Sequence, residues 1–351
     1  MVSTEVSTVR RILVEGIDSV SVETVATPEA ATGEVRVRST VVGICGSDVH
    51  AAHGRHPFID LPFRPGHEVV GVVDAIGDGV DASLVGTRVV VEPNLACGHC
   101  TQCLAGRYNI CAELAVFGCQ TPGGLTDAFT IAADRVIPLD DALDDRHAAL
   151  IEPLATPVHA VRRAATLVDG LDGKRVAVLG AGPIGLFVLL AARRAGATVV
   201  VADLLESKRA RAQRLGAVGS FDPTASDAVA TAKEALGGPA DVVIDCVSRE
   251  SSVAQAVDLV DKGGVVLIVG VAAGATAVPL DLVQDREIIV AGCLMYVRED
   301  VREAIDMLTE GLVPIDEFVT GEFPLDRAAD AFTASTDPEH VKVLITVGGR
   351  P

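Results

Sequence analysis

The sequence contains no run rich in lysine and arginine, and its 29 basic residues are outnumbered by 48 acidic residues, which gives a formal net charge of -19. A field of this sign repels phosphate backbones and anionic lipid headgroups. Nucleic acid and membrane surfaces are therefore not expected as partners. The first eleven residues also lack the apolar segment of a signal peptide, so the expected location is the cytoplasm.

The sequence also lacks an uninterrupted apolar segment of membrane-spanning length. The longest apolar stretch, Val176 to Ala192, is broken by three glycines and one proline. A buried strand, turn and helix explain this stretch better. Because the chain has 351 residues, 49% of them hydrophobic, it is long enough for two domains with sizeable cores.

Cysteine is scarce, since the chain contains only eight, and four of these fall between positions 97 and 111. In a reducing compartment this spacing is typical of a metal site rather than of a disulfide framework. Four thiolates spaced C-x2-C-x2-C-x7-C can surround one Zn(II) as a closed, structural site. An iron-sulfur cluster is the chemical alternative. His99 lies inside this loop and is expected to be exposed rather than a ligand. The predicted ligands are Cys97, Cys100, Cys103 and Cys111.

Two patterns of secondary structure divide the chain. Short β-branched runs separated by glycine and proline extend from Ile12 to about Pro138 and predict a β-rich, barrel-like domain. From Lys174 onward, apolar strands alternate with helical segments, which is typical of a parallel sheet with crossover helices. After Val301 the sequence predicts one amphipathic helix and a strand from Lys342 to Val347, a segment that can return to the first domain.

A glycine-rich turn follows the apolar strand that ends at Leu179. In such a turn, glycines allow the backbone to approach a pyrophosphate, and the N-terminus of the following helix faces the anion. An ordinary tight turn between strand and helix is the alternative. Its motif residues are Gly180, Gly182, Pro183, Ile184 and Gly185.

Asp203 closes the next predicted strand, at the spacing that suits a hydrogen bond to a ribose 2'-hydroxyl. A carboxylate there repels the 2'-phosphate of NADP, so NAD is the predicted cofactor. Asp203 can also serve as the N-cap of the following helix. Lys208 lies nearby and could reach the ribose, although an exposed helical lysine is the plainer interpretation.

Two further segments carry a thiol, an imidazole and a carboxylate. Cys45 begins the run Cys45-Gly-Ser47-Asp48-Val-His50, and the second segment holds His67 and Glu68. Brought together, these groups would leave Zn(II) an open position, as a catalytic zinc requires. Each residue also has a plain structural interpretation, and the sequence alone does not show that the segments meet. Glu152, between Ile151 and Pro153, could be an exposed turn residue.

Taken in order, these motifs resemble the zinc-containing medium-chain alcohol dehydrogenases. The resemblance rests on CGSDVH at 45–50, GHEVVGVVDAIGDGV at 66–80, the four-cysteine lobe, IEPLATPVHA at 151–160 and LGAGPIG at 179–185, followed by Asp203. It covers nearly the whole chain. Within the family the sequence looks most similar to the branch of sorbitol, threonine and butanediol dehydrogenases.

The resemblance implies an α/β protein with a GroES-like catalytic domain at 1–156 and 296–351, which includes a zinc lobe at about 94–114. A Rossmann domain with a doubly wound parallel sheet occupies 157–295. It implies one catalytic and one structural zinc per subunit, NAD as cofactor, and a homo-oligomer, either a dimer or a tetramer. The implied catalytic zinc ligands are Cys45, His67, Glu68 and Glu152, the last binding directly or through the zinc water.

The same resemblance assigns the proton pathway. It implies that Ser47 takes the proton of the alcohol and passes it through the cofactor ribose toward His50, while Asp48 orients a zinc ligand. The residues implied at the nicotinamide end of the cofactor are Val269, Gly270, Val271, Leu294, Met295 and Tyr296.

The implied activity is oxidation of a secondary alcohol, such as a polyol, a diol or a cyclitol, to a ketone. Met295 stands where sorbitol dehydrogenases have an arginine that helps to hold the polyol, and Ala51 and Gly118 stand where they have pocket aromatics. Sorbitol itself is therefore doubtful. An L-threonine or sugar-acid dehydrogenase is an alternative, as is a non-catalytic nucleotide-binding relative, although that class typically loses the metal ligands that are present here.

Overall fold

The computed structural model describes residues 7–348, and the chain divides into two units. Unit 1 comprises the chain up to Pro153 and from Ala304 onward, and unit 2 comprises Leu154–Glu303. One boundary between the units falls inside helix α4 (Ile151–Leu167), and the other falls inside helix α10 (Arg298–Thr309). Residues 1–6 and 349–351, which the sequence assigned to the catalytic domain, lie outside the described residues.

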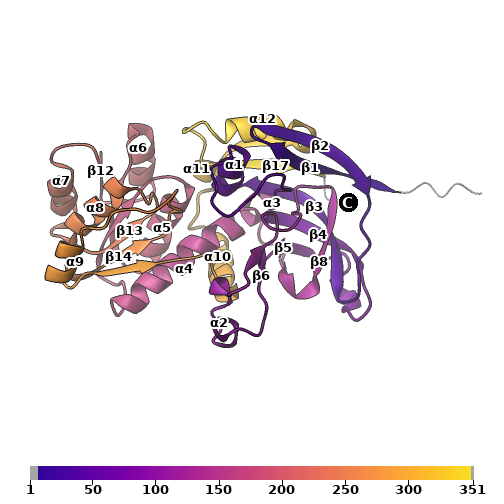
Figure 1. Ribbon diagram of the computed structural model, residues 1–351, viewed down its shortest axis with the longest axis horizontal. Coiled ribbons are helices and arrows are strands. Elements are labelled where there is room, and N and C mark those ends of the chain that lie inside the picture. The colour runs from indigo at the N-terminus through magenta and orange to yellow at the C-terminus, as the bar shows by residue number, and fades with distance from the viewer. Residues whose placement is uncertain (1–6, 349–351) are drawn as a thin grey trace, which may run out of the picture. The chain divides into compact units, whose positions relative to one another are not determined.

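Unit 1 is built on a mostly antiparallel sheet with the strand order β16-β17-β3-β4-β5-β9, and β8 also pairs with β3. Apolar side chains from these strands form its core. Figure 1 shows strands β17, β3, β4, β5 and β8 of this sheet together with the loop that carries α2 away from it. The elements of this unit are β1 (Thr8–Gly16), β2 (Ser19–Ala26), β3 (Glu34–Ile44), α1 (Gly46–Ala52), β4 (Glu68–Ile76), β5 (Arg88–Val91), β6 (Asn94–Leu95), α2 (Thr101–Leu104), β7 (Ala115–Val116), β8 (Ala128–Ala132), β9 (Val136–Pro138), α3 (Asp145–Ala148), α11 (Ile315–Phe318), β16 (Val319–Pro324), α12 (Ala328–Ala334) and β17 (Lys342–Thr346).

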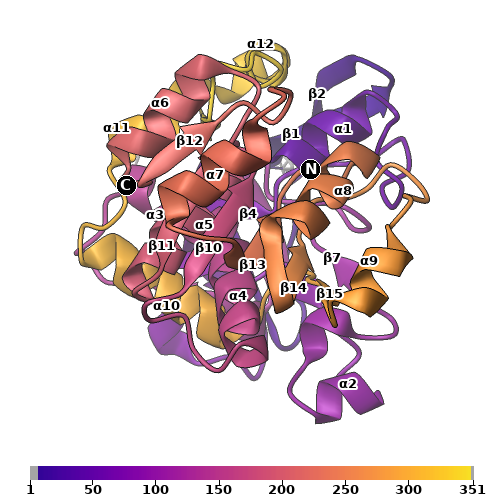
Figure 2. The same cartoon turned by 90° about the vertical axis from the view of Figure 1, so that its left-hand side faces the viewer.

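Unit 2 is a parallel six-stranded sheet with the strand order β12-β11-β10-β13-β14-β15. Figure 2 shows these strands in this order with their helices. Numbered from β10, this is the order 3-2-1-4-5-6 of a doubly wound dinucleotide-binding fold. The elements are β10 (Arg175–Leu179), α5 (Pro183–Arg194), β11 (Thr198–Ala202), α6 (Glu206–Arg214), β12 (Gly219–Phe221), α7 (Ala228–Leu236), β13 (Ala240–Asp245), α8 (Glu250–Leu259), β14 (Val260–Ile268), α9 (Leu280–Asp285) and β15 (Ile289–Gly292).

Alternation along the strands explains why helices cover both faces of this sheet. Ala177 and Leu179 of β10 point to the core formed with α7 and α8. Val178 points to the opposite face, where its side chain lies 3.4 Å from the Cβ position of Gly185 in α5. The doubly wound parallel sheet predicted from the sequence is confirmed.

The C-terminal segment is more structured than the sequence indicated. One amphipathic helix and one strand were expected after Val301, whereas the structure has α10, α11, α12 and the two parallel strands β16 and β17. Helices α11 and α12 contain only four and seven residues, too few for a helical periodicity to stand out in the sequence. Within residues 7–348, no helix is both long and apolar enough to cross a membrane.

Candidate functional site

Strand pairing in unit 1 brings three distant segments to one end of the sheet. Strands β3 and β4 are antiparallel and pair Gly43 with Glu68, so the end of β3 meets the start of β4. Strand β17 pairs with the other side of β3 and places Val343 opposite Ile44. Cys45, which follows β3, therefore lies next to residues that are far away in the sequence.

Cys45, His67 and Glu68 form a compact group of potential metal ligands. One donor atom from each, a sulfur, a ring nitrogen and a carboxylate oxygen, lies within 4.8 Å of the other two. His67 and Glu68 are buried and Cys45 is partly exposed. One sulfur, one nitrogen and one oxygen donor suit Zn(II) and leave a position for substrate, so the geometry fits a catalytic zinc.

Two glycines make room for this group. A Cβ atom at Gly43 would lie 2.0 Å from Oε2 of Glu68, so any larger residue at position 43 would displace the carboxylate. Gly66 has a φ of +109°, and a Cβ there would lie 2.2 Å from the backbone nitrogen of Leu125. Glycine at 43 and 66 is therefore a condition for the position of Glu68 and His67.

Asp48 is buried next to Cys45 and His67. One carboxylate oxygen accepts a hydrogen bond from the backbone N–H of Cys45 at 3.0 Å. The other lies 3.7 Å from Nδ1 of His67. Burial raises the pKa of Asp48. Burial alone would lower the pKa of His67, but the Asp48 carboxylate and the thiols of Cys119 and Cys45 raise it well above its usual value.

Sequence reasoning missed Lys342 as part of this site. Its ammonium group donates to both carboxylate oxygens of Glu68, at 2.6 and 2.9 Å, and to the carbonyl of Ile44 at 3.2 Å. Burial would lower the pKa of Lys342, but the negative groups Glu68, Cys45 and Glu152 raise it. The available signal was a lysine at the start of an apolar strand, which can be buried only with a partner.

Cys119 was also missed. Its sulfur lies 3.9 Å from Nδ1 of His67, and burial raises the pKa of its thiol. No pattern in the sequence indicates this contact, since Cys119 stands 52 positions from His67. The neighbouring Gly118 has a φ of +84°, and a Cβ there would lie 2.8 Å from the backbone of Gly66. In this backbone, position 118 cannot carry the aromatic side chain found in sorbitol dehydrogenases.

The remaining candidates of this site have different surroundings. Ser47 and His50 lie on α1, Ser47 partly exposed and His50 exposed. Partial desolvation, together with Arg55 and His53, lowers the pKa of His50. Glu152 is buried in the first turn of α4 and is not part of the group of Cys45, His67 and Glu68 defined by the 4.8 Å limit.

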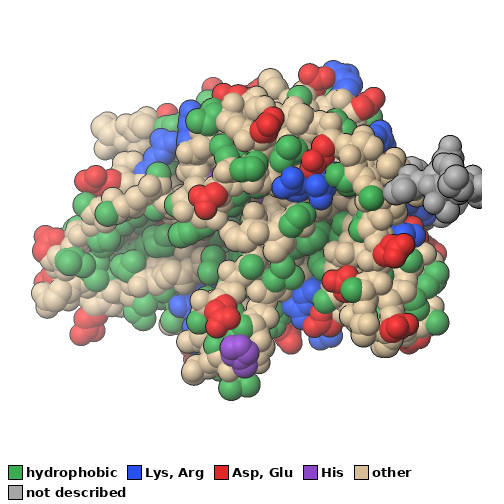
Figure 3. All heavy atoms as spheres, turned by 45° about the vertical axis from the view of Figure 1, so that its right-hand side comes forward, with side chains coloured by type: hydrophobic (Ala, Val, Ile, Leu, Met, Phe, Trp, Pro, Cys, Tyr) green, Lys and Arg blue, Asp and Glu red, His purple; other side chains and the backbone are tan. Residues whose placement is uncertain are grey.

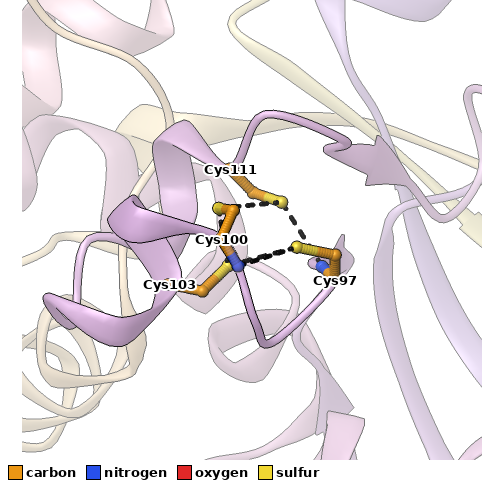
Figure 4. Close-up of side chains that lie close together, drawn as sticks. All are labelled: Cys97, Cys100, Cys103 and Cys111. Carbon is orange, nitrogen blue, oxygen red and sulfur yellow. Dashed lines mark hydrogen bonds between the residues drawn. The ribbon is translucent and has the colours of Figure 1, made fainter.

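The four-cysteine lobe closes as a second group of potential ligands. Strands β6 and β7 pair at its base, and its four sulfurs lie within 4.8 Å of one another (Figure 4). Three of the sulfur–sulfur distances are 3.5, 3.9 and 3.9 Å. A tetrahedron with zinc–sulfur bonds of about 2.3 Å has edges of about 3.8 Å, so the lobe fits a structural zinc.

Backbone N–H groups point at the sulfurs of the lobe, as expected for thiolates. The N–H of Cys100 donates to the sulfur of Cys97 at 3.4 Å, and those of Cys97 and Glu113 donate to Cys111, both at 3.3 Å. Backbone N–H groups of Ala112 and Cys103 lower the pKa of Cys100 to about 6. Such donors favour the deprotonated form that binds a metal.

In unit 2, the glycine-rich turn connects β10 to α5 with Gly182 as N-cap and Pro183 at the start of the helix. Gly180 has a φ of +97°. A Cβ at Gly185 would lie 1.8 Å from the carbonyl oxygen of Gly180, whereas a Cβ at Gly182 would meet nothing within 4 Å. The first and third glycines therefore serve the turn and the packing, and the second leaves open space where a pyrophosphate can approach.

Asp203 follows β11 and joins this turn to the next helix. Its carboxylate accepts hydrogen bonds from the backbone N–H groups of Ala181 at 2.9 Å and Leu205 at 3.0 Å. Helix α6 begins at Glu206 with Leu205 as its N-cap, so the N-cap role considered for Asp203 is wrong: its carboxylate binds the N–H of the N-cap residue instead. Lys208 is partly exposed on α6, and the neighbouring Arg209 donates to the carbonyl of Asp203 at 2.8 Å.

The other predicted cofactor residues follow β14 and β15. The backbone N–H groups of Val269 and Gly270 both donate to the carbonyl of Asp245. Met295 has a φ of +45°, which is rare outside glycine. Val271 and Leu294 are exposed, Met295 is partly exposed, and Tyr296 is buried.

Two of the three glycines of the turn, Gly182 and Gly185, give a test of its geometry. We expect Gly185→Ala to destabilise the protein by about 1–3 kcal/mol, because helix and turn must separate. Gly182→Ala is the matched control, since its Cβ meets no atom within 4 Å: it should keep its thermal stability and lose affinity for NAD. Thermal unfolding and NAD titration measure the two effects. Equal melting temperatures for both variants would contradict this account.

Two family models match the chain. One, described as alcohol dehydrogenase GroES-like domain, matches residues 31–141, and the other, described as zinc-binding dehydrogenase, matches residues 183–310. Among curated proteins, the chain is 35% identical to 2-dehydro-3-deoxy-L-galactonate 5-dehydrogenase of Pseudoalteromonas atlantica, over 89% of this chain and 91% of the relative. It is 32% identical to sorbitol dehydrogenase of Bombyx mori, over 95% and 97% of the two chains.

Among solved structures, the alcohol dehydrogenase rspB from Escherichia coli CFT073, in complex with NADH, matches with a TM-score of 0.90 at 28% identity and covers 97% of this chain and 100% of its own. The protein is therefore an oxidoreductase that transfers hydride from a secondary alcohol to NAD and uses zinc. The chain belongs to the zinc-containing medium-chain alcohol dehydrogenase family.

Proposed function

We propose that Cys45, His67 and Glu68 hold the catalytic zinc of this dehydrogenase, with Glu152 as the further carboxylate of the site. The observation that carries this proposal is the convergence of three different ligand types within 4.8 Å at one end of the sheet. Nδ1 of His67 faces Asp48, so the other ring nitrogen is left for the metal. Lys342 offsets part of the negative charge of the group.

When bound, zinc lowers the pKa of the alcohol and NAD accepts the hydride. The residues of this chain then have to remove the hydroxyl proton of the alcohol. In the proposed pathway, the hydroxyl of Ser47 takes this proton, and His50 accepts it near the surface. The lowered pKa of His50 keeps its imidazole neutral near neutral pH, the form that can accept a proton.

The four-cysteine lobe holds the structural zinc in this proposal, and the sequence 157–295 serves as the NAD-binding domain between the two parts of the catalytic domain, 1–156 and 296–351. The glycine-rich turn would hold the pyrophosphate of NAD, and Asp203 would hold the adenosine ribose. Val269, Gly270, Val271 and the stretch Leu294 to Tyr296 serve the nicotinamide end.

The proposed substrate is a polyhydroxylated secondary alcohol of the polyol, diol or cyclitol class. Relatives named sorbitol dehydrogenase support a polyol. A sugar acid is the second candidate, because relatives at 32% and 35% identity are named L-galactonate-5-dehydrogenase and 2-dehydro-3-deoxy-L-galactonate 5-dehydrogenase. Met295 argues against sorbitol itself, since a thioether does not donate a hydrogen bond to a hydroxyl.

Initial rates of NADH formation test the substrate class. The panel contains 2,3-butanediol, sorbitol, a cyclitol, L-galactonate and L-threonine, and chelator-treated enzyme is the control. We expect a zinc-dependent rate with a polyol, diol or cyclitol. A best rate with L-galactonate would assign the sugar-acid alternative. A zinc-loaded, NAD-binding protein without activity on any member of the panel would argue against the proposal.

Cofactor choice gives a sharper prediction at Asp203. Asp203→Asn keeps a side-chain oxygen for the N–H groups of Ala181 and Leu205 but removes the charge that repels a 2'-phosphate. We expect the ratio of kcat/KM for NAD to that for NADP to fall by at least about tenfold, which corresponds to about 1.4 kcal/mol. Steady-state rates with both cofactors measure it. An unchanged ratio would remove Asp203 from cofactor selection.

We further propose a cytoplasmic homo-oligomer, a dimer or a tetramer. The lobe requires reduced thiols to bind a metal, which fits a reducing compartment. Strand β15 is the last strand of its sheet, and its residues Ile289 and Val290 are 42% and 38% exposed. An exposed apolar edge favours pairing with another chain. Light scattering after gel filtration tests this, and a monomer would contradict it.

A further inference from the structure

The four-cysteine lobe carries a second group of potential ligands. Donor atoms of Cys97, His99 and Glu113 lie within 4.8 Å of one another, and Nδ1 of His99 lies 3.7 Å from the sulfur of Cys97. Cys97 belongs to both groups, whereas His99 and Glu113 are exposed. Figure 3 shows a histidine and an acidic group exposed on the small projection at the bottom of the view.

The backbone that arranges the thiolates also arranges these two side chains. His99 follows Gly98, which has a φ of +76°, so the chain turns sharply between Cys97 and His99. Glu113 donates its own N–H to the sulfur of Cys111 at 3.3 Å. The imidazole and the carboxylate are therefore held beside the sulfurs by the local fold of the lobe.

The charge of the lobe favours a second cation. Four thiolates exceed the charge of one Zn(II) by two. Between positions 96 and 114, the only Lys, Arg, Asp or Glu residues are Arg107 and Glu113, and their opposite charges cancel. A loaded lobe thus keeps a negative charge beside an exposed imidazole and an exposed carboxylate.

We propose that the lobe binds a second, exchangeable Zn(II) through Cys97, His99 and Glu113, with the Cys97 thiolate shared by both zinc ions. One sulfur, one nitrogen and one oxygen donor form a set that Zn(II) accepts with water in the fourth position. This inference rests on the structural zinc proposed for the four cysteines. His99 is exposed, as the sequence predicted, and the proposal adds a ligand role that the sequence did not predict.

Zinc content of the whole enzyme tests the proposal. The protein is first dialysed free of loosely bound metal and then equilibrated with micromolar Zn(II), and zinc per chain is measured by mass spectrometry at both stages. We expect wild type to gain one zinc in the second stage, and the double variant His99→Ala, Glu113→Gln to gain none. His147→Ala is the matched control, since it removes a partly exposed histidine outside the lobe, 2.8 Å from Asp144, and should behave as wild type.

Equal gains in wild type and double variant would overturn the proposal. So would a loss of zinc from the double variant before the titration, because His99 would then belong to the structural site. A chain that holds no zinc in the lobe at the first stage would instead contradict the structural zinc itself. Failure of the second site and failure of the structural site therefore give different results.

Cadmium NMR tests the shared thiolate. In protein loaded with 113Cd, two lobe resonances coupled to each other are expected for wild type, and a single uncoupled lobe resonance for the double variant. Two lobe resonances without mutual coupling would contradict the bridge through Cys97.

Discussion

Replacing Lys342 with methionine is expected to destabilise the metal-free protein by about 3–5 kcal/mol, because it leaves the Glu68 carboxylate buried without a cation. Both oxygens of Glu68 accept hydrogen bonds from Lys342, at 2.6 and 2.9 Å, and both residues are buried. A methionine fills similar space but supplies no positive charge. Urea unfolding in the presence of a chelator measures the change.

A second variant distinguishes loss of the pair from loss of packing. Lys342→Met combined with Glu68→Gln removes both charges, so it should recover most of the lost stability. Lys342→Arg keeps a charge and should fall between wild type and Lys342→Met. If Lys342→Met alone unfolds at the same urea concentration as wild type, the ion pair does not stabilise the fold.

The pH dependence of this effect has a defined direction. The folded pKa of Lys342 is raised above its usual value of 10.5. The stability that Lys342 contributes is therefore fully present below that value and is lost as the pH rises through the folded pKa. The difference between wild type and Lys342→Met should stay constant from neutral pH to about 10 and shrink in more alkaline solution.

Zinc binding should partly replace the lost charge. Zn(II) placed near Glu68 supplies the positive charge that Lys342→Met removes, so zinc should stabilise this variant more than it stabilises wild type. The carboxylate freed from Lys342 should at the same time bind the metal more strongly and compete with the alcohol. A higher KM for the alcohol with zinc still bound is the expected kinetic result.

The sequence alone predicted the features that depend on residues close together along the chain. The parallel sheet of unit 2 follows from apolar strands alternating with helices, and β10 ends at Leu179, as expected from its sequence. The metal site of the lobe was equally predictable from the sequence, because its four cysteines lie within fifteen residues and their spacing alone suggests one metal. In both cases the chemistry depends on residues close together along the chain.

The site in unit 1 depends instead on pairing between distant strands. Cys45 meets His67 only because β3 and β4 pair Gly43 with Glu68, and Lys342 reaches Glu68 across 274 positions. No periodicity in the sequence specifies this register. A resemblance could name Cys45 and His67 as ligands, but only the structure reveals the ammonium group held against the Glu68 carboxylate.

The catalytic zinc and the structural zinc should be separable by single substitutions. Cys45→Ser is expected to reduce zinc from two to one per chain in protein dialysed against zinc-free buffer. It should also lower kcat/KM by about 10³-fold or more, a loss of about 4 kcal/mol of transition-state stabilisation. Cys100→Ser should lose the other zinc and mainly stability, because a closed four-thiolate site contributes folding energy.

Comparing the two variants excludes a general effect of losing a thiol. Cys293→Ser, a partly exposed cysteine outside both ligand groups, should keep two zinc ions after the same dialysis. Metal analysis, urea unfolding and NADH formation together assign each zinc. If Cys45→Ser keeps both zinc ions and wild-type activity, the group of Cys45, His67 and Glu68 is not the catalytic centre, and Cys119 beside His67 becomes the thiol to examine.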